Sequence, residues 1–229
     1  MNFYVVNFSK HMYSEFMSEK VVKPLLRGHI HQEMFFVALG AAIVLISNTQ
    51  NLPDALSICV YSLGLFSMFG VSAVYHRINW SVSKRAILRK LDHSAIYIMI
   101  AGTFTPIAHL GLPSDSSLKL LIIIWSICSA GVIKSIFFTN LPKFLNAVFC
   151  LIAGYMITPY LGELKASVGS EGVVLIILGG VVYSVGAIIY GIKRPNPWPK
   201  TFGYHEIFHA LVSIAAVMHF IVIYRLVNN

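Results

Sequence analysis

The 229-residue sequence predicts an all-α integral membrane protein, a bundle of seven transmembrane helices with a cytoplasmic N-terminus and an outside C-terminus. Hydrophobic residues make up 57% of the chain and charged residues only 11%, whereas a soluble domain carries about 25% charged residues. Uncharged stretches recur at about the 20-residue length that a helix needs to cross a bilayer. Helices are expected rather than strands because a helix satisfies its own backbone hydrogen bonds in lipid.

Seven stretches that lack Asp, Glu, Lys and Arg mark the expected spans. They cover residues 34–53, 55–76, 93–114, 120–133, 144–162, 172–192 and 207–224. The fourth stretch is short, but it continues past Lys134 to Leu141, and a lysine near a helix end can extend its ammonium group to the interface. The connections are too short for another domain. We therefore expect a cytoplasmic or interfacial segment over residues 1–32 and one transmembrane domain over residues 33–229.

The basic residues predict the orientation of the chain. Cytoplasmic loops are enriched in Lys and Arg. With the N-terminus inside, 14 of the 17 Lys and Arg residues fall in cytoplasmic segments, and only Lys119, Lys165 and Arg225 fall outside. The net charge of +8 then indicates contact with membrane lipids and not with nucleic acid.

Candidate metal ligands converge at the cytoplasmic end of this topology. His76 ends the second span, Asp92 opens the third, and His205 and His209 open the seventh. The i, i+4 spacing of His205 and His209 places both rings on one helix face, where they can share one metal ion. His76 would add a third nitrogen and leave one tetrahedral position for water, as in catalytic zinc sites.

Two further residues are candidates for catalysis. A carboxylate this close to the hydrocarbon needs a partner, so we expect Asp92 to act as a general base or as an orienting acceptor for water. Ser72 precedes His76 by one helical turn and could orient the water or the imidazole. The ordinary alternatives are an ion pair of Asp92 with Arg89 or Lys90 and a bond from Ser72 to its own helix backbone.

The other histidines and the cysteines give weaker signals. The segment His205-Glu-Ile-Phe-His209 also matches the metalloprotease pattern HExxH, with Glu206 as base, but an acid in a first helical turn also stabilises the helix dipole. His219 lies about 15 Å beyond His209 along a helix and cannot share its metal. We expect His29 and His31 at the interface and His109 near the outer end. Single cysteines at 59, 128 and 150 support neither a disulfide framework nor a CxxC metal site.

Several segments, taken together, resemble the bacterial hemolysin III family. They are Ser72-Ala-Val-Tyr-His76, Leu91-Asp-His-Ser-Ala-Ile96, Ala101-Gly-Thr-Phe-Thr-Pro106 and His205-Glu-Ile-Phe-His209 with His219-Phe220. This family is the prokaryotic branch of the progestin and adiponectin receptor superfamily, which is related to alkaline ceramidases. The resemblance implies seven helices, a cytoplasmic N-terminus and a Zn²⁺ ion near the inner leaflet. Its ligands would be His76, His205 and His209, with Asp92 and Ser72 beside the water.

Three functions follow as hypotheses. The first is a zinc-dependent hydrolase of a lipid, such as a ceramide-like amide, in a bacterial plasma membrane. The second is a non-enzymatic regulator of membrane lipid or energy homeostasis in which zinc is structural. The third is a cytolysin or pore former, which the few charges in the spans and the lack of a signal-peptide pattern in the first 32 residues make the weakest.

Overall fold

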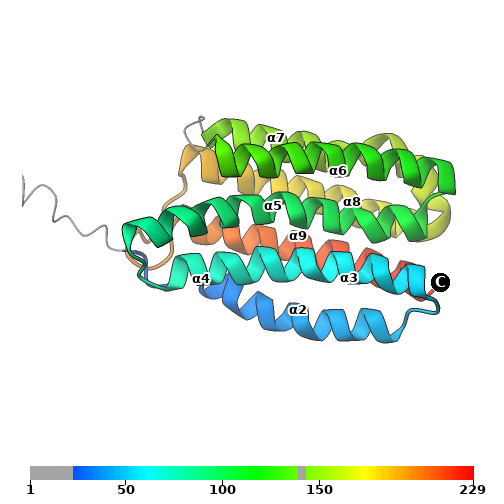
Figure 1. Ribbon diagram of the computed structural model, residues 1–229, viewed down its shortest axis with the longest axis horizontal. Helices are drawn as coiled ribbons and strands as arrows, with labels where there is room; N and C mark the ends of the chain where they lie inside the picture. Colours follow the sequence, from blue (N-terminus) through cyan, green and yellow to red (C-terminus); the bar gives the residue numbers. More distant parts are fainter. Residues whose placement is uncertain (1–22, 139–142) are drawn as a thin grey trace, which may run out of the picture.

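The computed structural model of the protein describes residues 23–138 and 143–229, which form helices and contain no strand. Residues 1–22, which make up most of the expected N-terminal segment, and residues 139–142, where the extended fourth span would end, lie outside the described part. The helices run side by side along the long axis of the molecule (Figure 1). In chain order they are α2 (His29–Ser47), α3 (Leu52–Phe66), η1 (Ser67–Val71), α4 (Ser72–Arg77), α5 (Val82–Gly111), α6 (Ser114–Phe137), α7 (Lys143–Tyr155), η2 (Thr158–Tyr160), α8 (Leu161–Ile192) and α9 (Tyr204–Val227).

The predicted all-α membrane fold is confirmed. Within the described residues, six helical stretches are long and apolar enough to cross a membrane: His29–Ser47, Leu52–Arg77, Val82–Gly111, Ser114–Phe137, Asn146–Ile192 and Tyr204–Val227. Large apolar side chains cover their outer faces, including Phe36, Ile122 and Ile188, each more than half exposed. An apolar exterior of this extent is typical of a surface that faces lipid rather than water. The expected number of seven spans is not confirmed by this count.

The Asn146–Ile192 stretch accounts for the difference. Its 47 residues would measure about 70 Å as one helix, more than twice the roughly 30 Å hydrocarbon core. Gly169 interrupts it with a left-handed φ of 70°, a conformation that glycine adopts without strain. On either side of this break, the Tyr155 and Ser184 hydroxyls are 2.9 Å apart. Ser167, next to the break, donates to the Gly111 carbonyl at 2.7 Å, so the break lies beside the end of α5.

The central helix α5 is longer than the sequence predicted. It begins at Val82, whereas the uncharged stretch begins at residue 93, so its first turns carry Lys84, Arg85, Arg89 and Lys90. The added turns protrude at the end of the bundle where α4 lies (Figure 1). The pattern of charged residues underestimated the length of this helix. Basic side chains can also lie on helical turns that continue beyond the hydrocarbon.

Close packing between α3 and α5 holds the centre of the bundle together. A Cβ atom built on Gly64 would lie 3.2 Å from the Ile98 carbonyl oxygen, and one on Gly102 would lie 3.1 Å from the Val60 carbonyl oxygen. Small residues allow helix backbones to approach this closely in membranes. This contact holds α5 beside α3, and the start of α5 lies beside α4.

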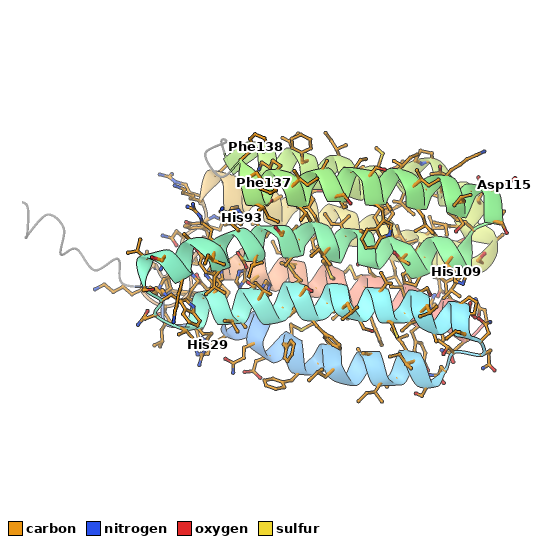
Figure 2. All side chains as sticks on the ribbon, viewed as in Figure 1. His29, His93, His109, Asp115, Phe137 and Phe138 are labelled. Carbon is orange, nitrogen blue, oxygen red and sulfur yellow. The ribbon has the colours of Figure 1, made fainter. Side chains whose placement is uncertain are left out.

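His76, His205 and His209 lie at the end of the bundle where α4 ends and α9 begins. Figure 2 shows His29 and His93 at this end and His109 and Asp115 at the opposite end. We call it the histidine end. The C-terminus lies at the other end of the molecule (Figure 1).

Candidate metal centre

The helix that carries His76 changes its winding just before the site. α3 continues into the five-residue π-helix η1, and α4 then carries Ser72 and His76. A π-helical turn is a rare, wider turn that occurs most often at functional sites. Both side chains are buried, with 2% of Ser72 and 9% of His76 exposed.

The first two turns of α9 carry the other two histidines, and a buried acid holds the start of this helix. One Glu206 oxygen accepts a hydrogen bond from the Gly203 backbone N–H at 2.8 Å, which caps the helix. The other oxygen pairs with the Arg27 guanidinium. Because both oxygens of Glu206 have structural partners, the geometry argues against the metalloprotease interpretation, in which this carboxylate would activate water.

His76, His205 and His209 come together in one cluster, as the sequence predicted. One ligand atom from each residue lies within 4.8 Å of those of the other two. The Nε2 atoms of His76 and His205 are 3.2 Å apart. Two nitrogens bound to one tetrahedral zinc at about 2.0–2.1 Å would be separated by about 3.3 Å. The three imidazoles therefore fit a metal ion of the zinc type, although the cluster alone does not select one metal.

Asp92 and Ser72 lie beside this cluster. The Asp92 carboxylate is 3.9 Å from the His76 Nε2 atom, and the Ser72 hydroxyl reaches it as a hydrogen-bond donor. No ion pair joins Asp92 to Arg89 or Lys90 within the described part of the chain, so this alternative has no support there. The carboxylate is close to the ligand cluster without being one of its three members.

His31 was missed as part of this site. The sequence argument placed it at the interface, but the residue is fully buried on α2, and this expectation is wrong. Its ring stacks on that of His209, with centroids 3.7 Å apart and 5° between the planes. Neither ring nitrogen has a hydrogen-bond partner among the described residues. The expected depth of His31 in the membrane could have indicated its place. His31 lies near the start of the first span, which begins at the same end as His76 and His205.

Gly28 allows the chain to pass close to His76. Its φ of 81° is in the left-handed region, and a Cβ atom built there would lie 2.8 Å from the His76 Cβ. Any larger residue would be strained and would displace His76. Just before it, the Leu25 and Leu26 N–H groups donate to the Lys200 and Thr201 carbonyls, which ties this segment to the start of α9.

Three further histidines, His29, His109 and His219, lie outside the cluster. The His109 Nε2 atom lies 3.0 Å from an Asp54 oxygen at the opposite end of the bundle. His219 donates to the Ile176 carbonyl at 3.5 Å, as expected of a hydrogen-bonded residue within the bundle. His29 pairs with Arg77.

A cavity of about 1700 Å³ opens beside the cluster. Small-molecule sites usually measure about 300–1,000 Å³, so this volume suits a larger ligand. His76, His205 and Asp92 line one part, and apolar residues such as Ile100, Phe104 and Ile107 line its continuation into the bundle. Lys23 lines it as well, and its pKa is lowered by partial burial and by the positive charges of Arg85 and Arg27.

Comparison with known proteins agrees with this architecture. The sequence model of the haemolysin-III related family matches residues 19–220. The "Hemolysin-3 homolog" of Bacillus subtilis (strain 168) is 32% identical over 192 residues, which cover 83% of this chain and 87% of that protein. The "Hemolysin-3" of Bacillus cereus is 30% identical over 209 residues, which cover 90% of this chain and 91% of that protein.

A more distant relative extends the likeness to animals. The "Adiponectin receptor protein" of Drosophila melanogaster is 25% identical over 209 residues, which cover 80% of this chain but 46% of that protein. The two Bacillus relatives and the apolar helices indicate an integral, multi-pass protein of a bacterial plasma membrane. The match over residues 19–220 and the near full-length likeness to both Bacillus proteins mean that this chain belongs to the haemolysin-III related family.

Proposed function

We propose that the protein is a zinc-dependent hydrolase of membrane lipids that carry an acyl linkage, such as a ceramide-like amide. The observation that carries the proposal is the three-histidine cluster with Asp92 beside it, at one part of a large cavity that apolar residues line further along. Such a cavity can hold acyl chains in its apolar part and bring the linkage next to the histidines.

The residues of the chain have separate roles in this proposal. His76, His205 and His209 hold the ion, which when bound polarises a carbonyl oxygen and lowers the pKa of water. Hydrolysis adds hydroxide to the acyl carbon, breaks its bond to nitrogen and places a proton on the released amine. Asp92 accepts the proton from water and returns it to the leaving nitrogen. Ser72 orients the Asp92 carboxylate through its hydroxyl.

We also propose seven spans, with the histidine end in the cytoplasm. The Gly169 break and the Tyr155–Ser184 contact across it support a chain reversal, which divides Asn146–Ile192 into two crossings. The excess of basic residues in the loops at the histidine end supports its cytoplasmic side. The site would then act on lipids of the inner leaflet.

The experiment is fatty-acid release from a panel of ceramides and lysolipids by the zinc-loaded protein in detergent and in liposomes. Release by the wild-type protein and none by His209→Ala would support the hydrolase. If zinc-loaded protein releases no fatty acid from any lipid, the regulator with structural zinc becomes the better interpretation. Leakage of vesicle contents without fatty-acid release would instead favour the pore former.

A further inference from the structure

One face of α5 changes in polarity along its length. Arg85 and Arg89 are followed on this face by Asp92, then by Ile96 and Ile100, and further on by Phe104 and Ile107, and all of them line the cavity. Their spacing of three and four residues is that of one helix face. The cavity wall therefore runs from cations, through the candidate metal centre, to a part in which apolar residues predominate and Thr103 is the polar residue that α5 contributes.

The separation between these residues along the α5 axis follows from the rise of about 1.5 Å per residue in an α-helix. Arg89 precedes Asp92 by three residues, or about 4.5 Å along the axis. Ile107 follows Asp92 by 15 residues, or about 22 Å, which exceeds the roughly 15 Å depth of one leaflet of the hydrocarbon core. The apolar part is long enough for an acyl chain.

The described residues that line the cavity carry an excess of positive charge. Six Lys and Arg residues line the cavity, namely Lys23, Arg27, Arg85, Arg89, Lys90 and Lys134, whereas Asp92 is its one acidic residue among the described part of the chain. Arg27 is paired with Glu206, and Lys134 donates to the Asn146 side-chain oxygen at 2.9 Å. Lys23 donates to the Ile78 carbonyl at 3.0 Å and is exposed to the positive charges of Arg85 and Arg27.

The two arginines on α5 have no acidic partner among residues 23–138 and 143–229. The Arg85 guanidinium lies 5.7 Å from the centre of the Tyr75 ring, which holds it by a cation–π contact. Neither Arg85 nor Arg89 forms an ion pair within the residues that the structure describes. The general enrichment of cations in cytoplasmic loops explains their presence near the interface. It does not explain their i, i+4 placement on the helix face that continues into the cavity.

We propose that Arg85 and Arg89 bind a phosphate group of a lipid whose acyl chain lies along α5 towards Ile107. Guanidinium groups bind phosphate oxygens through paired, charge-assisted hydrogen bonds. In a lipid bound this way, the linkage between headgroup and acyl chain lies beside Asp92 and the histidine cluster. The inference rests on the proposed function for the role of that cluster, and it narrows the substrate class from membrane lipids with an acyl linkage to those that also carry a phosphate group.

The test compares two lipids that differ only in phosphate. Dioleoyl phosphatidic acid and dioleoylglycerol are titrated into the full-length, detergent-purified protein, and bound lipid is measured by native mass spectrometry, with inorganic phosphate as a third probe. We expect phosphatidic acid to bind about tenfold or more tightly than dioleoylglycerol. Equal binding of the two lipids would overturn the proposal. Inorganic phosphate binding as tightly as phosphatidic acid would overturn the lipid as occupant.

Matched variants locate the site. Arg85→Gln/Arg89→Gln should lose the preference for phosphatidic acid and bind dioleoylglycerol as before, while Lys119→Gln/Lys165→Gln, which removes two exposed cations elsewhere, should keep it. An unchanged preference in the arginine variant, or an equal loss in the lysine variant, would contradict the proposal. Zinc content of each variant verifies that the histidine cluster is intact.

These measurements separate the two proposals because they need no turnover. A protein that prefers phosphatidic acid but releases no fatty acid would keep this inference and refute the hydrolase. A protein that hydrolyses ceramide without any preference for the phosphate would do the opposite.

Discussion

The rings of His31 and His209 lie parallel, with 3.7 Å between their centroids. An imidazole binds a metal through a lone pair in its own plane, and the planes of the two rings are parallel and separate, so a metal held by His209 would not face a lone pair of His31. His31 therefore cannot be a further ligand of that ion. It restricts the rotation of the His209 ring, as groups around metal ligands commonly do.

His31→Ala should weaken zinc binding about tenfold, because groups that orient a ligand typically contribute 10–100-fold in affinity. His31→Phe should retain most of the affinity, since a planar ring can still stack on His209. Zinc retention against a graded series of chelators measures both variants, with His109→Ala as control. Equal losses in the Ala and Phe variants would mean that stacking is not the cause.

Removal of any one of His76, His205 or His209 should abolish stoichiometric zinc. Two imidazoles are too few for a stable tetrahedral site. Metal analysis of each purified Ala variant measures this loss. His219→Ala is the control, because its ring contacts the Ile176 carbonyl instead of the cluster. Full zinc occupancy in His205→Ala would refute the ligand assignment.

Asp92→Asn should keep the zinc and the fold but lose turnover by about 10²–10⁴-fold, since an amide cannot accept the proton from water. Fatty-acid release, metal content and the thermal unfolding midpoint are measured on the same preparation. A stable, zinc-loaded Asp92→Asn protein with wild-type activity would exclude the base role. A parallel loss of zinc and stability would indicate a structural carboxylate.

Arg27→Met should destabilise the protein by about 3 kcal/mol or more, because it leaves the buried Glu206 carboxylate without its counter-ion. The double variant Arg27→Met/Glu206→Gln should recover part of that loss, since the buried charge is then absent. Thermal unfolding in detergent compares the two. If the double variant is no more stable than Arg27→Met, the ion pair is not what stabilises the first turn of α9.

Cysteine labelling in whole cells tests the seven-span topology. With a membrane-impermeant maleimide, Ser170→Cys should be labelled from outside and Asn79→Cys only after the cells are broken. A reporter fused after Asn229 should also be outside. Labelling of Ser170→Cys only in broken cells would contradict the reversal at Gly169, and outside labelling of Asn79→Cys would reverse the orientation.

The sequence predicted that five residues would lie close together because each prediction depends on local information. The i, i+4 spacing of His205 and His209 and the position of His76 at a span end require only helix geometry and the depth of each segment. Ser72 and Asp92 followed from the same arguments. Their meeting at one cluster needed only that the spans alternate in direction.

The other features depend on packing between distant segments. The burial of His31 depends on α2 lying against α9, and the structural role of Glu206 depends on Arg27, far away in the chain. The early start of α5 was missed because charge marks the edge of the hydrocarbon and not the end of a helix. No sequence pattern that we used distinguishes a π-helical turn from an α-helical one.

The π-helix Ser67–Val71 makes the direction of the Ser72 and His76 side chains depend on how the helix is wound as well as on residue identity. Each residue of an α-helix rotates the next by about 100°. Because this wide turn contains one residue more than an α-helical turn, loss of one residue within it would leave an ordinary α-helix in which Ser72 and His76 face nearly the same way. The same five residues wound as an α-helix would instead turn Ser72 and His76 by up to about 100° away from the cluster. A relative could therefore keep every site residue and still lack the three-histidine cluster, if its helix kept all five residues but not the wide turn.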